Sequence, residues 1–130
     1  MGNPLLLDVV QYLVDNALVQ GDGIDAFRDF TPEAPDTLVA LHEYKGDPSV
    51  QHEELVNRSV QIISRAKSAN EARLRALEIH KSLISDNLII NFTQYRWGQV
   101  YLRQTPFKIG IDGNGRTSYG FNVGITTTTE

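Results

Sequence analysis

The sequence contains no cysteine, and only one methionine and one tryptophan occur among its 130 residues. Without cysteine the chain can form no disulfide bond, no thiolate zinc site and no cysteine nucleophile. Long hydrophobic runs are missing as well, because Asp8 interrupts the apolar stretch near the N-terminus. No basic residue precedes that stretch, as one would in a secretory signal. We therefore predict neither a secretory signal nor a membrane-spanning segment.

The remaining composition is that of an ordinary globular protein. Hydrophobic residues make up 41% of the chain and charged residues 22%. A chain of this length buries enough apolar surface for one core. We predict a single domain over residues 1–130.

The charge is divided unevenly along the chain. Residues 1–55 carry eleven acids and two bases, a net charge of −9, whereas residues 56–130 carry five acids and ten bases, a net charge of +5. Two interpretations are open: the two halves lie against each other within one molecule, or opposite faces of neighbouring copies meet in a ring. The total of −4 argues against tight binding to nucleic acid.

Apolar residues that recur three and four positions apart predict two helices. The first covers residues 4–18, with Asn3 as its cap and Pro4 in its first turn. The second covers residues 69–85, where Ser68 and Glu71 have the spacing of a capping box. In this second helix Ala72, Ala76, Ile79 and Leu83 form one apolar face, with Leu77, His80 and Ile84 beside it.

Stretches rich in β-branched and aromatic residues predict the strands. We expect a short strand near residues 24–26, longer ones at 37–44 and 58–65, and an exposed loop at 49–57. An interrupted strand follows at 92–106, and residues 107–111 and 117–125 form a C-terminal hairpin. In its last strand Tyr119, Phe121, Val123 and Ile125 alternate with small or polar residues, which indicates one buried face. The predicted fold is α+β: two helices packed on a mostly antiparallel or mixed β-sheet with a C-terminal β-hairpin.

No motif indicates catalysis or a metal centre. His42, His52 and His80 are the only histidines, and they lack the two-histidine spacing of zinc sites. No GxSxG or GxGxxG pattern is present. We predict no catalytic residue, no metal site and no cofactor.

The sequence DGNGR at residues 112–116 superficially matches the start of a calcium loop. The twelfth position of such a loop needs an acid, but here it is Val123, and the flanking segments are predicted strands. We interpret Asp112, Gly113, Asn114 and Gly115 as a structural hairpin turn.

Residues 106–125, PFKIGIDGNGRTSYGFNVGI, resemble the C-terminal hairpin of the minor capsid or tail terminator proteins of long-tailed, siphovirus-type bacteriophages. The shared pattern is a proline, an apolar strand, a glycine, an aspartate, a Gly-Arg turn, an aromatic residue and an asparagine. Here these are Pro106, Gly110, Asp112, Gly115, Arg116, Tyr119 and Asn122. Residues 27–36, 41–46 and 58–83 resemble earlier segments of that family in the same order.

The resemblance implies a structural assembly protein, not an enzyme. Members of the family form a six-fold ring that caps the head-proximal end of the tail tube, stops its polymerisation and presents the head-tail joining surface. The implied partners are other copies of the chain, the tail tube protein and a head completion or connector protein. DNA can pass through such a ring without specific binding, and the implied location is the head-tail junction of the virion, after assembly in the host cytoplasm.

Within this interpretation we predict that Lys108 and Arg116, near the hairpin tip, lie at a subunit or tube contact. Two alternatives stay open. One is a head completion protein that docks on the connector, and the other is a small ligand-binding or enzymatic α+β domain.

Overall fold

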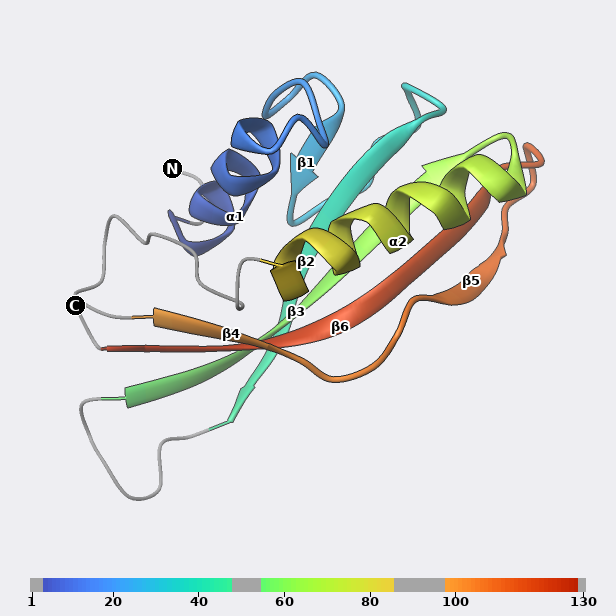
Figure 1. Cartoon of the computed structure of the whole chain (residues 1–130). Coiled ribbons are helices and arrows are strands. Elements are labelled where there is room, and N and C mark those ends of the chain that lie inside the picture. Colours follow the sequence, from blue (N-terminus) through green and yellow to red (C-terminus); the bar gives the residue numbers. More distant parts are fainter. Residues whose placement is uncertain (1–3, 48–54, 86–97, 129–130) are drawn as a thin grey trace.

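The computed structural model describes residues 4–47, 55–85 and 98–128 (Figure 1). The elements follow the order α1 (Pro4–Asp15), β1 (Ala26–Arg28), β2 (Leu38–Asp47), β3 (Leu55–Ala66), α2 (Ala69–Ser85), β4 (Gly98–Leu102), β5 (Phe107–Ile111) and β6 (Thr117–Thr128). Most of the predicted loop at 49–57, including His52, and the first part of the interrupted strand lie outside the described residues. The described end of that loop, residues 55–57, is instead the start of β3, and the interrupted strand ends at Leu102, before the predicted residue 106.

The strands form one six-stranded mixed sheet with the order β1-β2-β3-β6-β4, in which β5 also pairs with β6. β1 runs parallel to β2, and the other pairs are antiparallel. β5 pairs with residues 117–120 of β6 and β4 with residues 123–127, so the two short strands follow one another along the same edge of β6. The α+β prediction is confirmed.

Both helices cover the same face of the sheet, and the main core lies between them (Figure 1). The Tyr12 hydroxyl of α1 lies 2.7 Å from the Ser82 hydroxyl of α2, which links the helices across this layer. The alternation predicted for β6 is confirmed at its centre, where Phe121, Val123 and Ile125 are buried. The core also contains Leu5, Leu6, Val9, Val10 and Leu13 from α1, Val39, Leu41, Val60 and Ile62 from β2 and β3, and Ile79 and Leu83 from α2.

Helix α2 has the predicted bounds, and its capping hydrogen bond is present. The amide of Glu71 donates to the Ser68 hydroxyl oxygen over 3.2 Å. The side chains predicted to flank the apolar face behave differently, because Leu77 is 38% exposed and Ile84 is 54% exposed. The buried face of α2 is therefore narrower than the sequence suggests.

Helix α1 ends three residues before the predicted position. Ala17 adopts a left-handed backbone with a φ of 58°. The amide of Leu18 donates to the carbonyl of Leu13, and that of Ala17 to the carbonyl of Val14. This is the hydrogen-bond pattern of a Schellman motif, which ends a helix at its left-handed residue, usually a glycine.

Strands β2 and β6 are longer than predicted. β2 continues to Asp47, because a register shift between Glu43 and Lys45 lets the strand stay paired with β3. β6 continues to Thr128, so the threonine tail, which has no distinctive sequence pattern, extends the ladder with β3 as far as Leu55.

Candidate functional site

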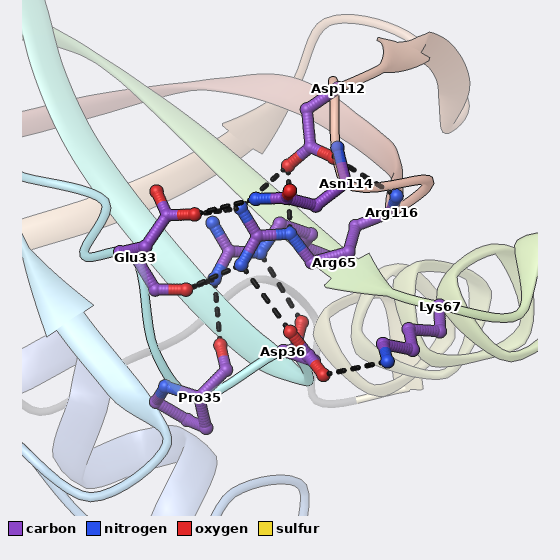
Figure 2. A network of polar contacts seen from close by, with 8 residues as sticks. All are labelled: Glu33, Pro35, Asp36, Arg65, Lys67, Asp112, Asn114 and Arg116. Carbon is purple, nitrogen blue, oxygen red and sulfur yellow. Dashed lines mark hydrogen bonds and ion pairs between the residues drawn. The ribbon is translucent and has the colours of Figure 1, made fainter.

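Two arginines, Arg65 and Arg116, form hydrogen bonds with the segment that connects β1 to β2 (Figure 2). Arg65, near the end of β3, donates to the backbone carbonyl oxygens of Glu33, Pro35 and Asp36, over 3.3, 2.6 and 3.2 Å. The segment also contacts β2, since the Thr31 hydroxyl lies 2.9 Å from Nε2 of His42. Residues 29–36 are therefore fixed by polar contacts even though they form no helix or strand.

Arg116 occupies the centre of the network in Figure 2, and its side chain is only 4% exposed. Its Nε donates to Oδ2 of Asp112 over 2.8 Å, and its Nη1 donates to the backbone carbonyl of Glu33. Its guanidinium also forms ion pairs with the carboxylates of Glu33 and Asp36, over 3.1 and 3.4 Å. Arg116 therefore joins the β5–β6 turn to the segment before β2.

The charges of the network change one another's proton affinity. The backbone amide and the side chain of Arg116 donate hydrogen bonds that lower the pKa of Asp112 to about 2. The hydrogen bond between the Arg116 side chain and the Asp112 carboxylate also raises the pKa of Arg116. Burial lowers the pKa of the Arg65 guanidinium, and the neighbouring charge of Arg116 lowers it further.

The turn between β5 and β6 is built around the Asp112 carboxylate. Its Oδ1 accepts hydrogen bonds from the backbone amides of Asn114 and Arg116, over 2.9 and 3.0 Å. The amide of Asp112 donates to the carbonyl of Arg116, and Gly115 takes a left-handed φ of 75°. The Asn114 side chain reaches Oε1 of Glu33 over 2.7 Å, so the tip of the turn also belongs to the network.

Lys108 lies apart from this network, on the exposed strand β5. The large apolar residues Phe107, Ile109 and Ile111 of the same strand are exposed too. The structure therefore separates the two predicted contact residues: Lys108 points its charge to solvent, and Arg116 is engaged within its own chain. Their role at a subunit or tube contact stays a prediction.

Acids of the N-terminal half form ion pairs with bases of the C-terminal half within the molecule. Five ion pairs among the described residues join an acid of the first 55 residues to a base of the remainder. They are Arg58–Glu43, Lys67–Asp36, Arg75–Asp25, Arg116–Glu33 and Arg116–Asp36. The intramolecular interpretation is thus supported.

The sequence did not identify Arg65, Glu33 or Asp36 as members of a site. The sequence predicts Arg65 as the last residue of a strand and places Glu33 and Asp36 only within a segment that resembles the family. The contacts of Arg65 use backbone carbonyls about thirty residues away in the chain, and no pattern of residue types encodes such acceptors.

The hydrogen bonds and ion pairs of this arrangement hold the segment before β2 against the end of β3 and the β5–β6 turn. In the described part of the chain, no group of three or more His, Cys, Asp or Glu side chains could hold a metal ion. Over the same residues, neither helix combines the length and apolarity needed to cross a bilayer.

Comparison with known proteins gives one family. A family model described as "Bacteriophage tail terminator protein" matches residues 13–129, which include all six strands and helix α2. No curated protein sequence matches the chain significantly.

Proposed function

Because the chain belongs to the bacteriophage tail terminator family, we propose that it forms a ring on the head-proximal end of the tail tube. This ring stops tube polymerisation and presents the surface to which the head joins. The observation that carries the proposal is the family match over residues 13–129, nine-tenths of the chain. The partners are other copies of the chain, the tail tube protein and a head completion or connector protein, all within the virion.

The surface of the fold supports an assembly role. A ring with a fixed number of copies needs two different surfaces on each copy that fit each other and close. A sheet with two dissimilar edges offers such a pair, and the edge strand β5 exposes Lys108 together with three large apolar residues. Lys108 is therefore proposed to lie at a contact.

For Arg116 the proposal takes a different form. Its guanidinium is buried in contacts with Glu33, Asp36 and Asp112. At an assembly surface it would act by holding the turn and residues 29–36 in shape, with Asn114 and Glu33 nearest the partner. A charge reversal at Lys108 tests the contact without disturbing this network.

The test is growth of tail tubes from purified tube protein, with tube length measured by electron microscopy. Substoichiometric amounts of the chain are expected to halt growth, and a gold-labelled chain is expected to mark one end of each tube. The Lys108→Glu variant is expected to cap less efficiently, whereas Lys81→Glu, on the exposed side of α2, serves as a matched control.

Two results would overturn the proposal. Tubes that keep growing with label along their sides would exclude a terminator. Label found only at the connector of isolated heads would instead support the head completion alternative.

A further inference from the structure

A row of paired residues connects the two edge strands β1 and β5. Ala26 of β1 pairs with Val39, Val39 with Ser64, Ser64 with Tyr119, and Tyr119 with Lys108 of β5. One continuous row of paired residues thus runs across the sheet from β1 to β5, which lie on opposite sides of it in Figure 1. We name these two borders the β1 margin, residues 21–29, and the β5 margin, residues 107–111.

The β1 margin is closed by its own chain. The amide of Gly23 donates to the carbonyl of Ala26 over 2.8 Å, and the amide of Ala26 donates to the carbonyl of Gly21 over 3.3 Å. Asp22 therefore lies outside Ala26, to which it is joined by an isolated bridge. A partner at this margin meets side chains and a turn and does not extend the strand ladder at Ala26.

The two margins carry opposite charge. Residues 21–29 carry three aspartates and one arginine. Residues 107–111 carry one base, Lys108, and no acid. Asp22 accepts two hydrogen bonds from Arg28, and its side chain is still 35% exposed, so its carboxylate can meet a further cation.

Both margins also expose large apolar side chains. Ile24 is 59% exposed beside β1, and Phe30, which follows the margin, stacks edge-on against Phe27 and is exposed. In the β5 margin Phe107, Ile109 and Ile111 are exposed, with Ile111 at 60%. An interface of this composition buries apolar residues among complementary charges, as stable contacts between subunits do.

We propose that the β1 margin of one copy packs against the β5 margin of the next copy, with Lys108 opposite Asp22. The proposal rests on the ring of the proposed function and names the surfaces that close it. Ala26 and Lys108 end the same row, so the two margins lie at matching positions along the strands of each copy. Two different surfaces that meet head to tail close into a ring when the rotation between copies divides a full turn.

The absence of cysteine makes disulfide trapping a clean test. The variants Asp22→Cys and Lys108→Cys are purified separately, mixed in equal amounts and oxidised, with tail tubes present and absent. We expect disulfide-linked dimers in the mixture, because paired cysteines must bring their Cα atoms to within about 7 Å. Neither variant alone is expected to give them, and a chain carrying both changes is expected to give a ladder that ends in a closed ring.

The matched control is Lys81→Cys mixed with Asp22→Cys, since Lys81 is also an exposed lysine, on α2. This mixture is expected to give no dimers. If it gives as many as the Lys108→Cys mixture, the trapped dimers reflect collision and the margin contact is wrong. If Lys108→Cys instead links to a single-cysteine tube subunit, the β5 margin faces the tube and the proposal fails.

The outcome also separates this inference from the proposed function. A chain that caps tubes but forms no disulfide between the two margins keeps its function and loses the margin contact. A chain that forms the disulfide ladder but leaves tube growth unchanged keeps the margin contact and loses the terminator role.

Discussion

Asp112 serves both the turn and the arginine network with one carboxylate. Its pKa of about 2 lies below the ordinary value of 3.8, so the folded protein favours its charged form. A carboxyl group whose pKa falls on folding stabilises the protein above its unfolded pKa, and this contribution disappears as the pH falls through the folded pKa. The contribution of Asp112 is therefore complete above about pH 4 and lost towards about pH 2.

We expect the Asp112→Asn variant to be less stable than the natural chain near neutral pH. The difference in the free energy of unfolding is expected to shrink as the pH is lowered from about 4 to about 2, because the natural side chain then also becomes neutral. Urea unfolding at a series of pH values measures this, with Asp15→Asn, outside the network, as the control. A difference that stays constant over the whole range would contradict the role assigned to the charge.

Gly120 and Gly110 lie in the same hairpin, but their surroundings differ. A Cβ on Gly120 would lie 2.6 Å from the backbone oxygen of Ile62 and 3.0 Å from Cδ1 of Ile109, whereas one on Gly110 would meet nothing within 4 Å. Gly120→Ala is expected to cost about 1–3 kcal/mol, as overpacking of a tight site does. Gly110→Ala is expected to change stability by about 0.5 kcal/mol or less. Equal effects in urea unfolding would show that the strands β3 and β6 can move apart.

At the scale of elements, local chemistry determined how well each boundary could be predicted. The start of α2 follows from Ser68, whose hydroxyl accepts from an amide three residues later, and the apolar spacing then fixes the helix. The end of α1 could not be read in the same way, because Ala17 takes the left-handed position that usually belongs to glycine.

Long-range pairing overrode the turn residues in β2. Lys45, Gly46 and Asp47 have the composition of a turn, yet each pairs with a residue of β3. The parallel pairing of β1 with β2 could not be predicted from the sequence either. A strand of three residues has no pattern that distinguishes a parallel edge from an antiparallel one. Strand existence was predictable, whereas strand length and partner depended on the rest of the sheet.

The candidate site was predictable only in part. Asp112 and Gly115 carry the residue types that a tight turn requires, so the turn could be placed. The burial of Arg116 could not, because its acceptors other than Asp112 lie before β2, some eighty residues earlier in the chain. From the sequence alone, a basic residue at a hairpin tip is expected to lie on the surface. Only the fold places the carboxylates of Glu33 and Asp36 beside it.

At the scale of the whole molecule, one uneven charge distribution supplies two kinds of contact. Arg58, Arg75 and Arg116 pair with acids of the N-terminal half and hold the molecule together. Lys108, Asp22 and Asp29 remain near the surface, at opposite borders of the sheet. The two interpretations of the charge pattern are therefore compatible, since different residues serve each.

The two kinds of contact are expected to respond differently to salt. Exposed charges are screened over about 10 Å at 0.1 M salt and over about 3 Å at 1 M, whereas buried pairs are screened much less. Raising the salt concentration is therefore expected to weaken association of the natural chain with itself, measured by sedimentation velocity. The urea midpoint of the natural chain should change less, because Arg116 is 4% exposed. An association that becomes stronger with salt would mean that Phe107, Ile109 and Ile111 join the copies and that the opposite charges of the margins do not.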